Sequence, residues 1–193
     1  IHKPNGGLGF ARNSGIEQAE GEFIGIMGAS GSGKTTLLNV LSTIDTPTSG
    51  EIWISGVNLN ELSNTNAADF RKDHLGFIFQ EYFLLDSLTI RENISVPLTL
   101  KKLPPKKIDS MVQSLAERFG IASQLNKYPN ELSGGQRQRA SAARAIVKQP
   151  SILFADEPTG ALDSNSATEL LKALKEANED LHTTILMVTH DAY

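Results

Sequence analysis

The stretch Gly28-Ala29-Ser30-Gly31-Ser32-Gly33-Lys34-Thr35-Thr36 decides the fold of this 193-residue chain. It follows an apolar run, 23–27, that predicts a strand, and it precedes leucines at helical spacing. Glycines let successive backbone N–H groups turn inward without obstruction by Cβ atoms, and a helix start adds unpaired N–H groups and a positive dipole end. The stretch therefore predicts a loop that cradles phosphate groups between a strand and a helix.

The side chains of this loop have distinct expected roles. Lys34 supplies a mobile cation for the β and γ phosphates, the Thr35 hydroxyl ligates the accompanying Mg²⁺, and Thr36 reaches the α phosphate. The pattern G-x-x-x-x-G-K-[ST] in this setting favours a nucleotide loop over an ordinary glycine-rich turn. The predicted ATP-binding residues of the loop are Gly28, Ser30, Gly31, Ser32, Gly33, Lys34, Thr35 and Thr36.

Composition restricts the class of protein. The chain is long enough for one sizeable core with an appended subdomain, and 18 Lys and Arg against 22 Asp and Glu give a net charge of −4, which argues against a nucleic-acid partner. It contains no cysteine, which excludes disulfides and thiolate metal sites. No apolar run approaches the roughly 18 residues of a membrane span, and no secretory signal is present. We therefore expect a soluble, cytoplasmic protein.

Short apolar runs alternate with helical patterns, which predicts a mainly parallel sheet. The expected strands are 23–27, 52–54, 75–79, 152–155 and 184–188. Trp53 is expected to pack rather than to stack on a ligand, and the polar residues 58–66 indicate a loop. Ligands of parallel sheets gather at the carboxyl ends of the strands, which is where this chain places Gly28, Gln80, Asp156 and His190.

Helical patterns fill the intervals between the expected strands. One begins near Lys34, another occupies most of 106–148, and the last runs from Ser166 to Asn178. Ser166 and Glu169 have the spacing of a capping box. Because the long helical stretch lies between two strand-bearing halves, we expect a helical subdomain inserted into an α/β core.

The polar residues at the strand ends carry the predicted chemistry. Asp156 anchors Mg²⁺ through water, and Glu157 takes a proton from the attacking water, although two acids after a strand also suit a simple acidic turn. His190 hydrogen-bonds the γ phosphate. Gln80 bridges the metal ion and the attacking water. The predicted catalytic residues are Glu157, His190, Lys34 and Gln80, and the predicted metal residues are Thr35, Gln80 and Asp156.

A second glycine-containing motif, Leu132-Ser133-Gly134-Gly135-Gln136, precedes a helix that begins near Arg137. A serine and two glycines at a helix N-terminus form another phosphate-binding surface. It lies too far along the chain from Lys34 to share one site, so we expect it to serve the nucleotide of a second copy. Two chains would then face head to tail and enclose two ATP molecules, with Ser133, Gly134, Gly135 and Gln136 contributed across the interface.

Taken in order, these motifs resemble those of the nucleotide-binding subunit of an ABC transporter. The resemblance covers about 21–191. It assigns Walker A to 28–35, the Q-loop to Gln80, the signature motif to 132–136 and Walker B to 152–156. It also implies that Glu157 is the catalytic glutamate, that 161–163 form the D-loop and that His190 is the switch histidine. The wording of 76–80 and 155–163 is similar to that of the macrolide-exporter and lipoprotein-release group. Within it, bacitracin and lantibiotic resistance transporters are most similar.

The resemblance implies a fold and a domain organisation. The fold class is α/β: a P-loop NTPase core with a mainly parallel sheet, a small antiparallel β portion and an inserted α-helical subdomain. Residues 1–83 and 149–193 would form the ATP-binding core, and 84–148 the helical subdomain. The family also continues beyond the switch histidine, so the segment that ends at Tyr193 is expected to be incomplete.

The resemblance also implies an activity and partners. The expected function is Mg²⁺-dependent ATP hydrolysis that drives a separate membrane permease for antimicrobial peptide export or resistance, at the cytoplasmic face of the cell membrane. The expected partners are a second copy of the chain and the permease. A signalling or scaffold subunit of the cell-division or lipoprotein-release type is an alternative. A DNA-repair ABC ATPase is another, although the chain lacks the coiled-coil insertion and basic surface expected of that class.

Three further stretches leave alternatives open. The family stacks adenine on an aromatic residue before Walker A, and Phe10 is the candidate here, although we expect it to pack instead. Apolar residues of 83–90 are too numerous for a solvated loop, which indicates that some face a partner. The basic residues 101–107 are expected to form a solvated connection between helices rather than a phospholipid contact.

Overall fold

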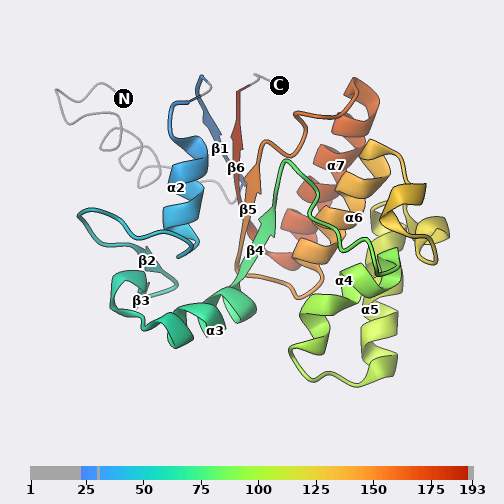
Figure 1. The fold of residues 1–193 in the computed structure, drawn as a ribbon, viewed down its shortest axis with the longest axis horizontal. Coiled ribbons are helices and arrows are strands. Elements are labelled where there is room, and N and C mark those ends of the chain that lie inside the picture. Colours follow the sequence, from blue (N-terminus) through green and yellow to red (C-terminus); the bar gives the residue numbers. More distant parts are fainter. Residues whose placement is uncertain (1–22, 30, 191–193) are drawn as a thin grey trace.

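A four-stranded parallel sheet forms the centre of the molecule in the computed structural model, which describes residues 23–29 and 31–190 (Figure 1). Its strand order is β1 (Phe23–Met27), β6 (Thr184–Thr189), β5 (Ile152–Asp156) and β4 (Leu75–Ile78). Met27 pairs with Thr189, and Asp156 pairs with Val188, so the carboxyl ends of these strands meet at one edge. The predicted parallel sheet is confirmed.

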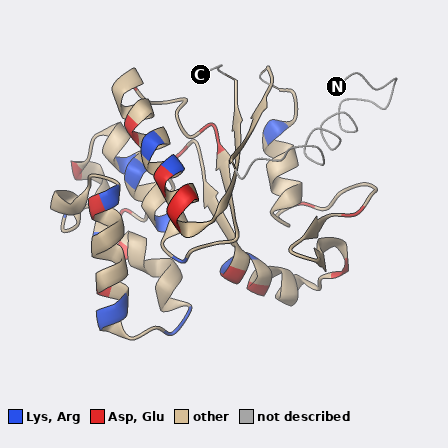
Figure 2. Cartoon of the chain, turned by 180° about the vertical axis from the view of Figure 1, so that it is seen from behind, with Lys and Arg blue, Asp and Glu red and all other residues tan. Residues whose placement is uncertain are grey.

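Helices cover both faces of the sheet. α2 (Lys34–Leu41) packs on one face, whereas α6 (Gly134–Ile146) and α7 (Ser164–Leu181) cover the other (Figure 1). Alternation along β5 explains the two cores, because Leu153 and Ala155 pack with the helices of the second face while Phe154 packs with Leu38 of α2. Charged residues lie mostly on the helices and connections, and the strands carry few (Figure 2).

A small antiparallel sheet lies beside α2. Its strands are β2 (Trp53–Ile54) and β3 (Val57–Asn58), joined by a turn in which Ser55 (φ 51°) and Gly56 (φ 79°) are both left-handed. Positive φ at both central residues is the geometry of the tight hairpin turn that matches strand twist. The expected packing of Trp53 is wrong, because its side chain is 60% exposed and its indole N–H donates to Glu51.

The loop expected over 58–66 is also wrong. A short 3₁₀ helix, η1 (Leu59–Glu61), is followed by α3 (Asn64–His74), whose first turn is capped by the Ser63 hydroxyl accepting from the Asn66 N–H. Polar residues cover the exposed side of α3, and its buried side contributes Phe70 to the core with α2. The polar composition of this stretch therefore reflects a solvated helix start.

Helices dominate the part of the chain between β4 and β5. They are α4 (Ile90–Thr99), α5 (Pro105–Arg118), η2 (Ala122–Gln124), η3 (Pro129–Glu131) and α6. The helical stretch expected over 106–148 is confirmed, and α4 is an addition to it. Thr89 and Glu92 form a capping box at the start of α4, and the basic residues 101–107 connect α4 to α5 and begin the latter.

The last helix, α7, begins at Ser164, and its N-cap lies three residues before the predicted cap, Ser166. The N-cap of α7 is Asp163, whose carboxylate accepts from the N–H groups of Asn165 and Ser166 and from the Ser166 hydroxyl. An aspartate at this position satisfies more of the exposed donors than Ser166 does, so the predicted capping box is replaced. Throughout 23–29 and 31–190, no helix is long and apolar enough to cross a membrane.

Candidate active site

The predicted site residues meet at the carboxyl edge of the parallel sheet. Gly28 follows β1, Glu157 follows β5, and His190 follows β6. Backbone hydrogen bonds attach Gly28 and Glu157 to the end of β6. The Gly28 N–H donates to Thr189 O at 3.3 Å, and the Glu157 N–H donates to Val188 O at 2.9 Å. The strand register therefore brings together residues that are far apart in sequence.

The backbone of the glycine loop binds the Lys34 ammonium. The Lys34 side chain is 5% exposed, and its Nζ donates to the carbonyl oxygens of Gly28 at 2.6 Å and Ala29 at 3.1 Å. Gly33 (φ 82°) caps α2 and carries no side chain, so the first N–H groups of the helix are not capped by the residue before them. Ser30, a predicted ATP-binding residue, lies outside the described residues, as does Phe10.

A chain of charged contacts leads from the loop to the end of β6. Lys34 Nζ lies 3.6 Å from Glu157 Oε1, and His190 Nδ1 lies 3.1 Å from Glu157 Oε2. Glu157 adopts a left-handed backbone conformation, with φ 44°, and its carbonyl accepts from the Gly160 N–H. This conformation is strained for a non-glycine residue, and the Glu157 carboxylate lies beside Lys34 of the loop.

Asp156 and Thr35 provide hard oxygen atoms next to this chain. Thr35 hydrogen-bonds to the Asp156 carboxylate, and burial raises the pKa of that carboxyl group. The charge of Glu157 also raises the pKa, whereas the Thr35 hydrogen bond and the Lys34 charge lower it. One carboxylate, one hydroxyl and phosphate oxygens suit Mg²⁺, which retains several waters in its coordination shell.

The same donor set is too small to be a metal site on its own. Among the residues that the structure describes, no three His, Cys, Asp or Glu side chains are grouped to hold a metal ion. A magnesium ion here would therefore depend on the nucleotide for further oxygen ligands. Thr35 and Asp156 fit that kind of shared site.

Gln80 lies beside the turn that follows Glu157. It comes two residues after β4, its side chain is exposed, and a Cβ atom built on Gly160 would lie 3.6 Å from Gln80 Nε2. Of the predicted catalytic residues, Lys34 and His190 each contact Glu157, and Gln80 lies against the turn that follows Glu157.

The signature residues lie elsewhere on the same chain. Ser133 caps α6: its hydroxyl accepts from the Gln136 N–H at 3.3 Å, and its N–H donates to Gln136 Oε1 at 3.0 Å. Ser133 is exposed, whereas Gly135 is buried where a Cβ atom would lie 2.7 Å from Ser166 Oγ. Because α6 and α2 cover opposite faces of the sheet (Figure 1), one chain presents its two glycine motifs on different sides.

The roles of several residues near the site were not predicted from the sequence. Gln138 and Arg144 of α6 hydrogen-bond to backbone carbonyls of 79–83, and buried Asn93 of α4 hydrogen-bonds to residues 85–89, which precede α4. Their only sequence signal is a polar residue within an otherwise buried helix face. That signal does not identify the partner, which lies dozens of residues away for Gln138 and Arg144.

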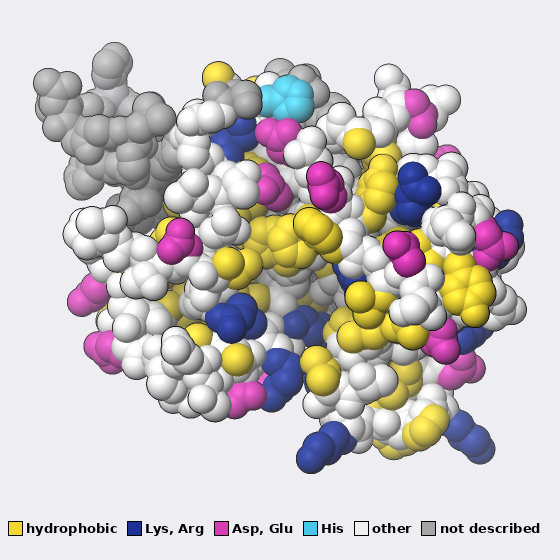
Figure 3. All heavy atoms as spheres, in the orientation of Figure 1, with side chains coloured by type: hydrophobic (Ala, Val, Ile, Leu, Met, Phe, Trp, Pro, Cys, Tyr) yellow, Lys and Arg dark blue, Asp and Glu magenta, His cyan; other side chains and the backbone are white. Residues whose placement is uncertain are grey.

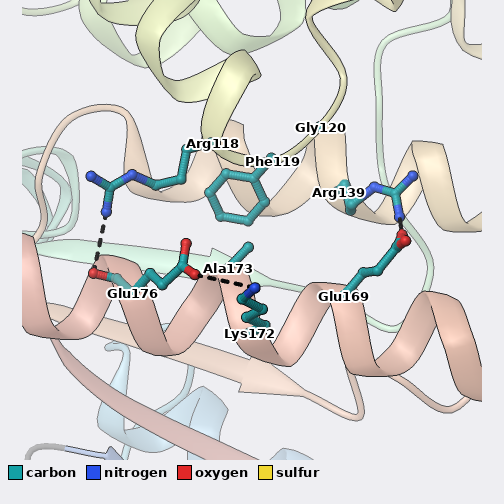
Figure 4. A pocket seen from close by; sticks show the side chains of 8 residues that line it. All are labelled: Arg118, Phe119, Gly120, Arg139, Glu169, Lys172, Ala173 and Glu176. Atoms are coloured by element: carbon teal, nitrogen blue, oxygen red, sulfur yellow. Dashed lines mark hydrogen bonds and ion pairs between the residues drawn. The ribbon is translucent and has the colours of Figure 1, made fainter.

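A cavity of about 320 Å³ lies among α5, α6 and α7 and includes none of the predicted site residues (Figure 4). Its basic side chains are already engaged: Arg118 pairs with Asp180 at 2.7 Å, Arg139 pairs with Glu169, and Lys172 lies 4.0 Å from Glu176. The opposed charges join the three helices. We therefore assign this cavity a structural role.

Comparisons with known proteins identify the family. The ABC transporter family matches residues 12–160. Bacitracin export ATP-binding protein BceA of Halalkalibacterium halodurans is 59% identical over 176 residues, which cover 91% of this chain and 70% of that protein. Macrolide export ATP-binding/permease protein MacB of Vibrio parahaemolyticus is 45% identical over 176 residues, which cover 91% of this chain and 27% of MacB.

Solved structures share the fold. A dimeric structure of the bacterial ABC transporter cassette MJ0796 superimposes with a TM-score of 0.82 at 40% identity, covering 90% of this chain and 76% of that one. Another MJ0796 dimer, in a post-hydrolysis state bound to ADP and Pi, has the same TM-score and coverage at 39% identity. The family match, the identity to BceA and the shared fold show that this chain belongs to the ABC transporter family, as one of its ATP-hydrolysing subunits.

Proposed function

We propose that this chain uses ATP hydrolysis at the Lys34 loop to drive a separate membrane permease that handles an antimicrobial peptide. The observation that carries the catalytic part is the contact chain from Lys34 through Glu157 to His190. The substrate class rests on the similarity to BceA, a bacitracin export protein. As the subunit that would drive this permease, the chain is proposed to act at the cytoplasmic membrane face as a peripheral subunit, in line with its similarity to the export proteins BceA and MacB.

In the proposed reaction, Glu157 acts as the general base. Its carboxylate takes a proton from water while the water oxygen bonds to the γ phosphorus and the bond from that phosphorus to the ADP oxygen breaks. Lys34 binds the β and γ phosphates, and His190 hydrogen-bonds the γ phosphate. The 3.1 Å contact between His190 Nδ1 and Glu157 orients both side chains toward the same point.

Thr35, Asp156 and Gln80 are the proposed magnesium residues. The ion, when bound, neutralises phosphate charge. The hydrogen bond between Thr35 and Asp156 aligns the hydroxyl and carboxylate at one side of the loop. Gln80 lies at the neighbouring turn, where its amide can orient the attacking water.

A second copy of the chain is proposed to complete each site. Ser133 is exposed at the N-terminus of α6, where it can meet a phosphate presented by another molecule. The dimeric form of the similar cassette MJ0796 supports this assembly. We propose that the signature residues Ser133, Gly134, Gly135 and Gln136 bind the partner's nucleotide.

An apolar groove is the proposed contact for the permease. A cavity of about 400 Å³ is lined by Glu81, Tyr82, Phe83, Leu84, Asp86, Pro129, Asn130 and Arg137. Phe83 at its edge is 58% exposed, and nearby Leu85 is 48% exposed. Apolar side chains gather over this part of the surface (Figure 3). Exposed aromatic and aliphatic groups around a cavity are typical of a protein-binding site.

Replacing the proposed base tests the reaction. Glu157→Gln should lower the rate of phosphate release by about 10²- to 10⁴-fold, because the amide does not accept the proton. ATP binding should be retained, and a nucleotide-bound dimer should accumulate during size-exclusion chromatography with light scattering. Glu179→Gln, at an exposed position on α7, is the control. Hydrolysis by Glu157→Gln at the parental rate would show that Glu157 is not the base.

A further inference from the structure

Side chains of α6 hold the backbone of the segment 79–83. Gln138 Nε2 donates to Phe79 O at 3.2 Å. The guanidinium of Arg144 donates to two carbonyls, with Nη2 3.0 Å from Tyr82 O and Nη1 2.6 Å from Phe83 O. A planar guanidinium offers donors in a fixed fork, so one side chain sets the orientation of two successive peptide groups.

The same helix also contacts the Tyr82 side chain. The guanidinium carbon of Arg137 lies 5.1 Å from the centroid of the Tyr82 ring, and a Cβ atom on Gly134 would lie 3.1 Å from the Tyr82 hydroxyl oxygen. Contacts therefore extend from the first turn of α6 to its last. They join α6 to the segment that carries Gln80.

Burial makes these contacts costly to break. The Gln138 side chain is 1% exposed, and burial lowers the pKa of the Arg144 guanidinium. Among the described residues Arg144 makes no ion pair, so the two carbonyls stabilise its charge. Loss of Gln138 or Arg144 would leave a part-buried carbonyl, that of Phe79 or Tyr82, without this donor, which is expensive in a protein interior, whereas the Phe83 carbonyl lies at an exposed contact.

We propose that Arg144, together with Gln138, is a positioning residue that fastens the segment 79–83 to α6, so that Gln80 and Ser133 move as one unit. This inference rests on the proposed function, because it connects the proposed metal and water residue to the residue proposed to bind the partner's nucleotide. Phe83, at the edge of the apolar groove, belongs to the same unit.

Hydrogen exchange tests the attachment without reference to activity. Arg144→Met should raise the exchange rates of amides in 79–83 by about tenfold or more, because local opening no longer breaks two hydrogen bonds. Exchange in β5 and β6 should not change. Arg144→Lys, which keeps a donor, should show a smaller increase. Arg118→Met is the matched control, since Arg118 also donates to a backbone carbonyl, that of Glu176, but on α7.

A double-mutant cycle tests the path to Gln80. Arg144→Met should lower ATP turnover by about tenfold in the parent chain but less than about twofold in a Gln80→Ala background, because coupled residues are not additive. Arg118→Met should have equal effects in both backgrounds. All rates are measured well below the unfolding temperature of each variant.

The outcomes separate this inference from the proposed function. Unchanged exchange in 79–83 on Arg144→Met, or additive effects in the cycle, would overturn the positioning role even if the parent hydrolyses ATP. Absence of hydrolysis in the parent would instead contradict the proposed function, and the exchange measurement would still decide whether Arg144 holds the segment.

Discussion

Gly76 shows how a single residue sets the distance between the sheet and a helix. It is buried in β4, and a Cβ atom there would lie 2.7 Å from the backbone oxygen of Ala145 and 2.8 Å from Leu153 Cδ1. A backbone atom cannot rotate away as a side chain can. Glycine at this position therefore permits the close approach of α6 that the contacts to 79–83 require.

Gly76→Ala should lower the free energy of unfolding by about 1–3 kcal/mol, as overpacked sites do. The matched control is Gly25→Ala in β1, where nothing lies within 4 Å of the added Cβ. Urea denaturation of both variants measures the difference. Equal stabilities of the two variants would contradict the close packing of β4 against α6.

Lys148 is a second residue of interest, because its surroundings disfavour the protonated form of its amine. Its Nζ donates to the carbonyls of Arg71 at 2.8 Å and Lys72 at 2.7 Å, in the last turn of α3. Burial, with a contribution from nearby Lys101, lowers the pKa of Lys148 to about 8, and Asp73 partly opposes this shift. A neutral amine still has two N–H donors for the same carbonyls.

The lowered pKa of Lys148 predicts a pH dependence of stability. Between pH 8 and the unfolded-state pKa of about 10.4, the unfolded chain binds more protons, so the free energy of unfolding contributed by Lys148 rises with pH. Relative to Lys148→Met, the parent should gain about 1–2 kcal/mol across this window, allowing for solvent screening of a partly exposed group. Urea denaturation from pH 7 to 10.5 measures the gain, and parallel curves would contradict it.

At the scale of elements, α4 orders the loop that leads away from the active site. Asn93 is fully buried: its side-chain oxygen accepts from the Leu85 N–H, and its two N–H groups are shared among the carbonyls of Leu85, Leu88 and Thr89. This loop carries the exposed Leu85 beside the proposed permease groove. A buried side chain of one helix thus shapes a surface proposed for docking.

Asn93→Ala should lower the free energy of unfolding by about 1–3 kcal/mol, because it removes the side-chain donor of the part-buried Leu88 carbonyl and the acceptor of the Leu85 N–H. It should also weaken capture of the chain by its permease in detergent more than the loss of stability explains. Asn126→Ala, at an exposed position, is the control. Thermal unfolding and co-purification with the permease are the two measurements, and unchanged values in both would contradict the role of Asn93.

At the scale of the whole molecule, the arrangement of helices supports the proposed sharing of each site between two chains. α2 with Lys34 and α6 with Ser133 cover opposite faces of the sheet. In the proposed dimer, each chain presents one half of a phosphate site on each side. Two chains related by a twofold axis can complete two such sites at once.

Mixed dimers test this arrangement. A purified heterodimer of one Lys34→Ala chain and one Ser133→Ala chain should contain one intact site and one doubly defective site, whereas each homodimer should contain none. The expected result is one occluded ATP per heterodimer, measured with radiolabelled nucleotide under conditions that prevent hydrolysis. If both residues served the nucleotide of their own chain, the heterodimer would occlude none. Thermal unfolding checks Ser133→Ala for loss of the α6 cap, which is worth about 1 kcal/mol.

The local motifs were predictable because their meaning lies in contiguous residues. The glycine loop, the strand before it and Asp156-Glu157 after a buried strand were predicted from the sequence, and the structure places Lys34 and His190 each in contact with Glu157. The starts of α3 and α4 were missed, since polar caps such as Ser63 and Thr89 resemble loop residues until their helices are packed. Trp53 was expected to pack, but β2 lies at the surface and leaves it exposed.

The sequence by itself determined the family, the phosphate loop and the parallel sheet, because glycine spacing and apolar runs act through neighbouring residues. Only the tertiary structure decided that Arg144 and Gln138 hold the segment 79–83, that Gly76 must be glycine, and that Asn93 orders the loop after Gln80. Two of these three depend on contacts between residues some 60 or more positions apart. Such contacts depend on how helices pack on the sheet, which no single stretch of sequence records.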